Sequence, residues 1–395
     1  MEEFTVKAEK IVSGGNCLCH IDGKAVFVPY ALPEEILCVE ITKKTRDWNM
    51  AKIKKILEPS SHRTEPFCPL YGICGGCNMQ HIDSDFQKEI RKKLLLENFE
   101  RAGVFLEDDV DVIFGENKGY RARIRLSDGG FYQKGSHSVI GVDFCPVATK
   151  EINEWLSKNP FESRPKGSLK LFADKRVKNA SHIAISKENA QKSGHKKARF
   201  SGTVGGKSFE ENKCELEILK KTLAFDVRGF FQSNLDVLEK SIAHITGKIK
   251  GFRALDVYAG VGTFSAFLSD NFDFVTLVEH NRDALVYAEQ NLAGKKHESY
   301  GLPASLWAKR NAKNAIAFDA AVIDPPREGI ERDTLDWFCK ESKIPVIQSV
   351  SCDSATHARD VSKLIKAGYT LKKLTLLDFY PQTAHTESLA ELELK

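Results

Sequence analysis

Four short apolar segments in the second half of the chain alternate with stretches whose apolar residues have helical spacing. The apolar segments cover residues 254–258, 274–279, 320–323 and 346–349. The clearest helical stretch between them covers residues 281–292. Parallel strands need a crossover connection, usually a helix, so this alternation predicts a doubly wound parallel sheet with helices on both faces. We therefore predict an α/β domain with a Rossmann-like sheet over residues 235–395.

Two further regions precede this domain, because the chain has 395 residues and one hydrophobic core rarely extends beyond roughly 250–300 residues. Residues 1–58 contain short alternating strands separated by Gly, Pro and Asp turn signals, which predicts a small β-barrel. Residues 59–234 are predicted to form a central α+β domain. It contains a predicted helix over residues 84–101 that is capped by Asp83 or Ser84.

Composition narrows the cellular setting and the partners. Lys and Arg outnumber Asp and Glu by 58 to 54, and the net charge of +4 is compatible with nucleic acid without requiring it. No apolar run approaches the roughly 18 residues of a membrane span, and no secretory signal is evident, which predicts a cytoplasmic protein. The ten cysteines then indicate metal binding, catalysis or burial rather than disulfides. A basic, polar span over residues 187–197 is predicted to be a solvated loop or hairpin.

A glycine-rich turn follows the first strand of the predicted sheet. The segment 254–264 is an apolar strand that ends in Gly260-Val261-Gly262 before a predicted helix. Glycine lets the backbone pass close to a bound nucleoside group. The next strand ends at Glu279, where a carboxylate can accept both ribose hydroxyls. If the two glycines are considered alone, the alternative explanation is a tight strand-to-helix turn that binds no ligand.

Three further motifs lie near the ends of later segments. Asp324-Pro-Pro-Arg resembles the (Asp/Asn)-Pro-Pro signature of methyltransferases that act on nitrogen or on base carbons. Cys352 lies just past the strand 346–349, where open α/β sheets bind ligands, although a lone cysteine is most often a small buried hydrophobe. The run 378–387 ends in Glu387, for which an exposed carboxylate near a chain end is the alternative. Together these motifs resemble the uridine-5-methyltransferase family that includes the RumA/RlmD and TrmA enzymes.

This resemblance implies a covalent mechanism with S-adenosyl-L-methionine (SAM) as the methyl donor. It assigns Cys352 as the nucleophile that adds to carbon 6 of uracil, and Glu387 as the general base that removes the proton from carbon 5. Cysteine suits the first task because its thiolate is the most nucleophilic ordinary side chain. The resemblance also implies SAM contacts from Gln232, Tyr258, Thr263, Glu279, Asn311 and Asp324.

A group of closely spaced cysteines is the most specific short pattern in the chain. Cys68, Cys74 and Cys77 lie within ten residues, and three thiolates cannot complete a four-coordinate site. The resemblance implies Cys145 as the fourth ligand and a 4Fe-4S cluster carried by the central region 59–234. Zinc is the main rival, and simple burial is the remaining alternative. Because addition and elimination transfer no electrons, we predict a structural or RNA-orienting role for the cluster.

The amino-terminal barrel resembles a TRAM domain, an OB-like RNA-binding fold, most clearly over residues 23–29 and 31–33. A basic and aromatic patch on it consists of Lys43, Lys44, Arg46 and Trp48. A solvated hairpin tip is the alternative for this patch. A target uridine in folded RNA has to leave its stack to reach Cys352, which suits recognition of an RNA loop.

These observations predict SAM-dependent methylation of carbon 5 of a uridine in 23S rRNA, because the barrel and the cysteine motif together favour the rRNA member of the family. A tRNA uridine-5-methyltransferase and a non-catalytic RNA-binding iron–sulfur protein are the alternatives. RNA is the expected partner, and we expect a monomer with no obligate protein partner and no membrane contact. Glu34-Glu35, Ala259 and Asp353-Ser354 depart from the family pattern at turns and remove no catalytic group.

Overall fold

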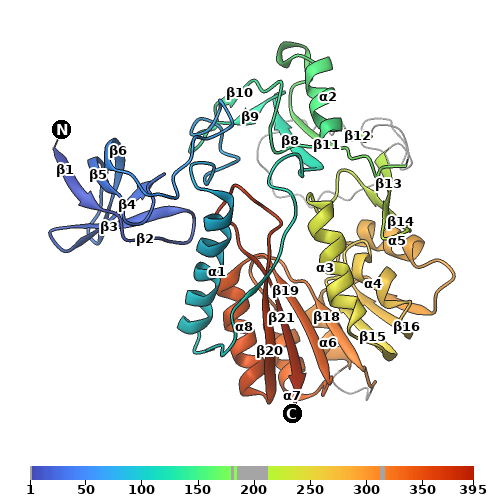
Figure 1. Ribbon diagram of the computed structural model, residues 1–395. Coiled ribbons are helices and arrows are strands. Elements are labelled where there is room, and N and C mark those ends of the chain that lie inside the picture. The colour runs from blue at the N-terminus through green and yellow to red at the C-terminus, as the bar shows by residue number, and fades with distance from the viewer. Residues whose placement is uncertain (1, 179–181, 185–211, 312–315) are drawn as a thin grey trace.

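The computed structural model describes residues 2–178, 182–184, 212–311 and 316–395. A small sheet at the amino terminus stands to one side of a larger body in which helices surround a second sheet (Figure 1). The span 187–197, predicted to be a solvated loop or hairpin, lies outside the described residues. Within the described ranges, no helix combines the length and the apolar character that a membrane span requires.

The amino-terminal region is a six-stranded sheet that curls into an open barrel (Figure 1). Its strands, in the order β1-β5-β6-β4-β3-β2, are β1 (Glu3–Lys7), β5 (Ile36–Lys44), β6 (Trp48–Glu58), β4 (Lys24–Pro29), β3 (Asn16–Ile21) and β2 (Lys10–Ile11). Register shifts between β5 and β6 mark bulges, and bulges bend a sheet and increase its twist. Strands β1, β4, β5 and β6 confirm the short strands predicted in residues 1–58, and β2 and β3 are additional.

The larger body is organised by an eight-stranded sheet with the order β17-β16-β15-β18-β19-β21-β20-β7. The strands are β7 (Asp111–Ile113), β15 (Gly251–Val257), β16 (Phe272–Val278), β17 (His297–Tyr300), β18 (Ala320–Ile323), β19 (Val346–Ser351), β20 (Tyr369–Leu377) and β21 (Glu387–Leu394). Strands β15 to β19 are parallel, as predicted. Strand β21 runs antiparallel to both of its neighbours, β19 and β20.

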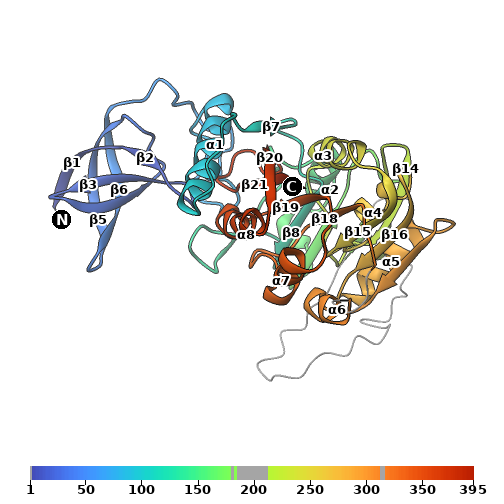
Figure 2. The ribbon, with the colours of Figure 1, turned by 90° about the horizontal axis from the view of Figure 1, so that it is seen from below.

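Helices cover both faces of this sheet because successive strand residues point to opposite sides. Ala320 and Val322 belong to one buried apolar cluster, whereas Ala321 and Ile323 belong to a second cluster. Side chains of α3 (Leu235–Gly247), α4 (Thr263–Leu268) and α5 (Arg282–Asn291) fill the first cluster. Side chains of α6 (Ala304–Asn311), α7 (Arg332–Lys340) and α8 (Ser354–Lys366) fill the second. Figure 2 shows α3 on the opposite side of the sheet from α6 and α7.

Helix α1 (Ser84–Arg101) has the predicted bounds, and the carboxylate of its N-cap Asp83 accepts a hydrogen bond from the Phe86 N–H. Its residues Leu95 and Phe99 belong to the second cluster of the α/β body. Strand β7 extends the large sheet. The predicted region 59–234 is therefore divided in the structure, because part of it folds onto the α/β body.

The rest of region 59–234 has a small core of its own, made by β8 (Arg123–Ser127), β11 (Ser168–Phe172) and α2 (Lys150–Lys158). Strand β12 (His182–Ala184) pairs with β11, and β9 (Phe131–Tyr132) pairs with β10 (Val139–Ile140). The hairpin of β13 (Lys213–Ile218) and β14 (Lys221–Asp226) instead contributes side chains to the first cluster of the α/β body. Residues 59–234, which include α1, thus connect the barrel to the large sheet.

We expect the substitution Leu95→Ala to lower the free energy of unfolding by about 2–5 kcal/mol, because it opens a cavity where α1 packs on the sheet. The side chain of Leu95 is 0% exposed. Urea unfolding followed by circular dichroism measures the effect. Leu57→Ala, at a position that is 44% exposed on the barrel, is the control and should leave the urea midpoint nearly unchanged. Equal shifts for the two variants would contradict this packing of α1.

Candidate active site

The reactive side chains gather where the strands of the large sheet end. In the antiparallel pair β19–β21, Ser351 lies opposite Ser388. Cys352, the next residue after β19, therefore lies beside Glu387, the first residue of β21. Asp324 follows directly after β18, the other neighbour of β19. The sheet thus brings a thiol and two carboxyl groups to one edge, and each carboxyl group raises the pKa of Cys352.

Cys352 is a half-buried thiol located immediately before the N-cap of α8. The side chain of Asp353 caps this helix by accepting hydrogen bonds from the Ala355 and Thr356 N–H groups. The pKa of Cys352 is raised to about 11, mainly by burial and in addition by the Glu387 and Asp324 carboxylates, whereas the Arg327 guanidinium lowers it. The thiol is protonated near neutral pH in this state, so nucleophilic attack requires positive charge or a proton acceptor nearby.

The Glu387 side chain is 3% exposed, and its carboxyl group makes few hydrogen bonds with the described residues. Its Oε1 accepts a hydrogen bond from the Gln232 amide at 3.4 Å, whereas its Oε2 has no hydrogen-bond partner among the described residues. Burial raises the pKa of Glu387 to about 8, and Asp324 contributes to this shift. The amide oxygen of Gln232 is also buried without a partner in the described parts of the chain. Two hydrogen-bond acceptors are therefore available next to Cys352.

The glycine turn after β15 has the geometry expected for a nucleoside site. Gly260 and Gly262 adopt φ values of +56° and +74°. A Cβ at Gly262 would come within 3.1 Å of Ala288, whereas a Cβ at Gly260 would meet no atom within 4 Å, so the space above Gly260 is open. Glu279 lies beside this turn, and its two oxygens accept hydrogen bonds from the Gly260 N–H at 2.8 Å and the Asn281 N–H at 2.6 Å. A carboxylate has further lone pairs, which can accept ribose hydroxyls.

The other predicted SAM contacts lie in different surroundings. Tyr258 precedes the glycine turn, and its hydroxyl accepts a hydrogen bond from the Glu331 N–H at 3.1 Å. Thr263 is the first residue of α4, directly after the turn. Asn311 is buried at the end of α6, where its amide nitrogen donates to the Trp307 carbonyl at 3.0 Å. This bond occupies one side of the Asn311 amide, and its contact with adenine stays a prediction.

The four cysteines predicted to bind a cluster are neighbours in the structure. Cys68 raises the pKa of both Cys74 and Cys145, and these two thiols in turn raise the pKa of Cys77. The Arg121 guanidinium opposes these effects at three of the thiols. Across the described ranges, however, no three His, Cys, Asp or Glu side chains are placed to hold a metal ion. The thiols thus form one group without the close convergence that a single ion needs.

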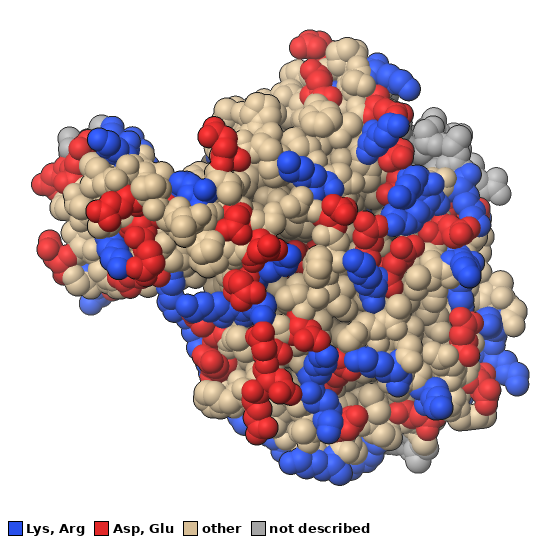
Figure 3. All heavy atoms as spheres, viewed as in Figure 1, with Lys and Arg blue, Asp and Glu red and all other residues tan. Residues whose placement is uncertain are grey.

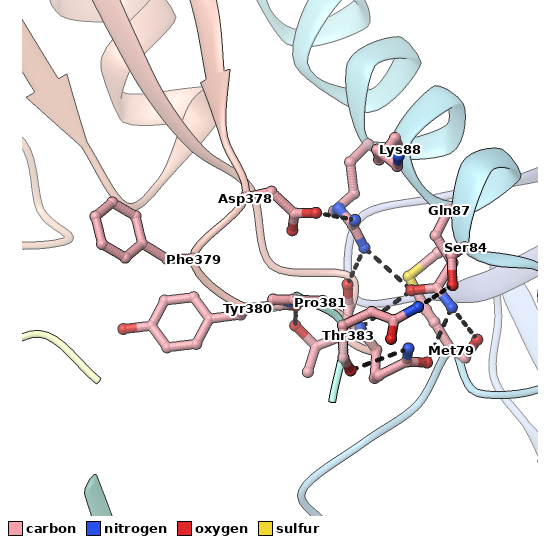
Figure 4. Close-up of polar contacts among 12 residues, drawn as sticks. Met79, Ser84, Gln87, Lys88, Asp378, Phe379, Tyr380, Pro381 and Thr383 are labelled. Carbon is pink, nitrogen blue, oxygen red and sulfur yellow. Dashed lines mark hydrogen bonds and ion pairs between the residues drawn. The ribbon is translucent and has the colours of Figure 1, made fainter. Parts of the chain in front are cut away.

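Several residues at the site carried no clear sequence signal. Asp256, buried in β15, accepts hydrogen bonds from the Ser265 N–H at 3.0 Å and from its hydroxyl at 2.5 Å, and burial raises its pKa to about 7. Tyr380 lies close enough to Glu387 and Cys352 that both raise its pKa. Its loop, residues 378–386, passes under α1 (Figure 4). The contacts of this loop join parts of the chain too distant in sequence for any local pattern to reveal.

The comparisons with known proteins agree with this site. A model of the tRNA (uracil-5-)-methyltransferase family matches residues 310–395, which include Asp324, Cys352 and Glu387. An uncharacterized RNA methyltransferase of Treponema denticola is 34% identical over 98% of both chains. The 23S rRNA (uracil(1939)-C(5))-methyltransferase RlmD of Shewanella amazonensis is 30% identical over 100% of this chain and 96% of its own.

A solved structure shares the whole fold. The chain superimposes with a TM-score of 0.73 on the Pyrococcus abyssi tRNA (uracil-54, C5)-methyltransferase in complex with S-adenosyl-L-homocysteine. The match covers 98% of this chain and 100% of that one, at 21% sequence identity. The fold and the site together define an RNA methyltransferase of the SAM-dependent class. The chain belongs to the RNA (uracil-5-)-methyltransferase family, which confirms the family predicted from the sequence motifs.

We expect Glu387→Gln to stabilise the protein more at alkaline than at acidic pH. The pKa of Glu387 is raised from 4.5 to about 8, so the folded state favours the protonated acid. Its contribution to stability is complete below about pH 4.5 and is lost as the pH rises through about 8. Glutamine does not titrate, so the gain in Tm over the wild type should be larger at pH 9 than at pH 6.

Glu393→Gln is the control for this prediction, because Glu393 lies on the same strand with an exposed side chain. Its Tm difference from the wild type should be small at both pH values. A Glu387→Gln gain that does not change with pH would show that the carboxyl group is ionised in the folded state.

Proposed function

We propose that this protein methylates carbon 5 of a uridine in 23S rRNA, with SAM as the methyl donor. The observation that carries the proposal is that the Cys352 thiol lies beside the buried carboxyl group of Glu387 at the end of the sheet, where one oxygen of this group has no hydrogen-bond partner among the described residues. Relatives of nearly equal length are named for methylation of uracil 1939 in 23S rRNA. Uracil 1939 is therefore the first position to test.

Cys352 begins the proposed reaction. Its sulfur forms a bond to carbon 6 of uracil, and the electrons of the carbon 5–carbon 6 double bond move to give an enolate. Carbon 5 then takes the methyl group, and S-adenosyl-L-homocysteine leaves. The pKa of about 11 for Cys352 means that formation of the thiolate depends on charge that enters with the substrates. When SAM is bound, its sulfonium would supply the methyl group and a positive charge near the carboxyl groups of Asp324 and Glu387.

Glu387 completes the reaction by removing the proton from carbon 5. The electrons of that carbon–hydrogen bond restore the double bond and expel the Cys352 thiolate. A base must be unprotonated to act, and the pKa of Glu387 is about 8. The rate of this step therefore rises as the pH increases towards about 8. Gln232 donates to Glu387, and its amide oxygen, which has no partner among the described residues, can accept the N–H of a uracil ring.

The residues around the glycine turn fit the nucleoside part of SAM. Glu279 would accept the ribose hydroxyls, and Gly260 leaves open space above the turn. Asp324 carries a carboxyl group whose pKa is raised to about 7 by burial. Such a group gains most from a nearby positive charge, which suits the methionine end of the donor or the target base. Tyr258 and Thr263 flank the turn and complete the proposed contacts.

Recognition of RNA is proposed to begin on the barrel. Lys43 lies over the Trp48 ring, with its Nζ 5.3 Å from the centroid, and Phe27 packs edge-on against Trp48. Such a basic and aromatic surface suits single-stranded or looped RNA. Positive and negative side chains alternate over the face shown in Figure 3. RNA attraction therefore depends on local patches, as the net charge of +4 suggests.

We also propose that Cys68, Cys74, Cys77 and Cys145 hold a 4Fe-4S cluster. The pKa values of Cys74, Cys77 and Cys145 are each raised by at least one other thiol of the group, and the Gly76 N–H donates to the Cys74 sulfur at 3.4 Å. Four cysteines are the usual ligands of such a cluster. These residues would hold the cluster between the barrel and the catalytic loop, where it can orient RNA.

The catalytic proposal predicts a stable covalent complex with RNA that contains 5-fluorouridine. Fluorine at carbon 5 cannot leave as a proton, so Cys352 stays bonded to carbon 6 after methyl transfer. We expect a complex that survives denaturing electrophoresis when SAM and a 5-fluorouridine 23S rRNA transcript are added. Cys352→Ala should give none, and Cys339→Ala, a thiol on α7 away from the site, should behave as the wild type.

The same assay separates the alternatives for the substrate. A complex with tRNA and none with 23S rRNA would favour the tRNA enzyme. The absence of any complex from the wild-type protein with either RNA would end the catalytic proposal and favour a binding protein.

For the cysteine group, we expect Cys74→Ala to lower solubility or RNA affinity before it changes the chemical step. The variant should lose bound iron and sulfide, measured by elemental analysis and visible absorbance, and bind 23S rRNA more weakly in a filter assay. Covalent complex formation at saturating RNA should be retained. Cys38→Ala on the barrel, outside the group, is the control. Unchanged stability and RNA binding in Cys74→Ala would overturn the proposed role, and zinc in place of iron would overturn the proposed cluster.

A further inference from the structure

The loop that leads to Glu387 is held by residues from the beginning of the chain. This catalytic loop, residues 378–386, joins β20 to β21. The carbonyl of Gln382 accepts hydrogen bonds from both the Asn78 N–H and the Met79 N–H, each at 3.0 Å. Asn78 and Met79 follow directly after Cys77 in the sequence. Figure 4 shows Met79 and Gln87 facing the loop residues between Asp378 and Thr383.

Gln87, on α1, also binds Gln382 of the catalytic loop. It is buried, and its amide nitrogen donates to the Met79 carbonyl at 3.0 Å, the Ile82 carbonyl at 2.9 Å and the Gln382 side-chain oxygen at 3.0 Å. Its amide oxygen accepts from the Gln382 N–H at 3.0 Å. One side chain thus binds the backbone and the side chain of Gln382 together. Gln382 has a φ of +69°, a conformation that a non-glycine residue keeps only when its surroundings hold it.

Asn78 makes a second set of contacts nearer to Glu387. Its side-chain oxygen accepts a hydrogen bond from the Ala384 N–H at 3.0 Å. Its side-chain nitrogen donates to the Gly14 carbonyl of the barrel at 3.1 Å. Ala384 is itself buried in the apolar core of the barrel. Asn78 therefore joins the barrel, the segment after Cys77 and the catalytic loop.

We propose that Asn78 and Gln87 are positioning residues for the general base, and that they act by holding Gln382 and Ala384 at fixed places before Glu387. The proposal rests on the proposed function. Glu387 has a single side-chain hydrogen bond within the described residues, at 3.4 Å, so its own contacts orient it weakly. The direction of its carboxylate therefore depends on the backbone that enters β21, and that backbone is set by the loop.

This role predicts which step of the reaction is affected. Cys352 adds to carbon 6 and carbon 5 takes the methyl group before the proton on carbon 5 is removed. A displaced Glu387 leaves these two steps intact and slows only proton removal and release of the thiolate. The methylated RNA then remains bonded to Cys352. Accumulation of this intermediate with natural uridine distinguishes a positioning role from a general loss of stability, which lowers all steps together.

The first test compares Asn78→Ala with Asn78→Asp in the full-length protein. Asn78 is only partly buried, so both variants should fold. Alanine removes both the acceptor for the Ala384 N–H and the donor to the Gly14 carbonyl, whereas aspartate loses only the donor and keeps the acceptor that holds the loop. For Asn78→Ala we expect kcat on a natural 23S rRNA transcript to fall on the order of tenfold to a hundredfold, with KM for RNA falling in parallel, so that kcat/KM stays nearly unchanged. Denaturing electrophoresis should show most of the enzyme bonded to RNA at steady state. Asn78→Asp should turn over like the wild type and accumulate little complex.

Gln87→Met is the second variant, and Leu95→Ala is its control. Methionine fills the space of Gln87 without its hydrogen bonds, whereas Leu95 lies on the same helix in a cluster that contains no residue of the catalytic loop. We expect complex to accumulate in Gln87→Met and not in Leu95→Ala, even if the two lose similar stability. Complex in both variants, or turnover that falls in Asn78→Ala and Gln87→Met without complex, would overturn the proposal.

The wild-type protein keeps this result separate from the proposed function. If it forms no complex with 5-fluorouridine RNA, the methyltransferase proposal fails. If it forms that complex while both positioning variants release product normally, only the positioning proposal fails.

Discussion

The antiparallel insertion of β21 between β19 and β20 is the contact on which the site depends. A purely parallel sheet would place the end of every strand at the same edge, and only residues that follow a strand could reach the site. Because β21 runs in the opposite direction, its first residue, Glu387, lies beside Cys352 at the end of β19. The chain must therefore return across α8 and β20 before it can supply Glu387, the proposed base. This return creates the catalytic loop, whose position must then be fixed by other parts of the protein.

The buried carboxyl groups at the same edge of the sheet destabilise the folded protein when no substrate is bound. Burial raises the pKa of Asp256 and Asp324 to about 7 and that of Glu387 to about 8. Asp256 and Glu387 each keep one oxygen without a partner among the described residues. Buried polar groups without partners destabilise a folded protein. A positively charged methyl donor and the hydrogen-bond donors of a base complement these groups, so the arrangement suits binding of substrates better than stability of the free protein.

Local patterns in the sequence predicted the elements well and their assembly less well. The helix over 84–101 and the strand over 320–323 have the predicted bounds, because helical spacing, an N-cap and a buried apolar run are local signals. Motifs also located Cys352 and Glu387. The position of α1 on the α/β body and the contacts of Gln87 with Gln382 were not predictable in this way. They join residues nearly three hundred positions apart, and no periodicity or spacing carries that information.

The barrel packs against the loop 378–386, so its position is coupled to the position of Glu387. Gly15 has a φ of +85°, and a Cβ there would lie 2.7 Å from the Asn78 side chain and 3.0 Å from Ala384. Only glycine permits this approach. The barrel loop at Gly14 and Gly15 therefore contacts both Asn78 and the residue that Asn78 holds. A shift of the barrel relative to the α/β body must move Asn78, Ala384 or both. The barrel, which is the proposed RNA-binding region, and Glu387, the proposed base, are thus parts of one packed unit, in which α1 and the segment after Cys77 connect them.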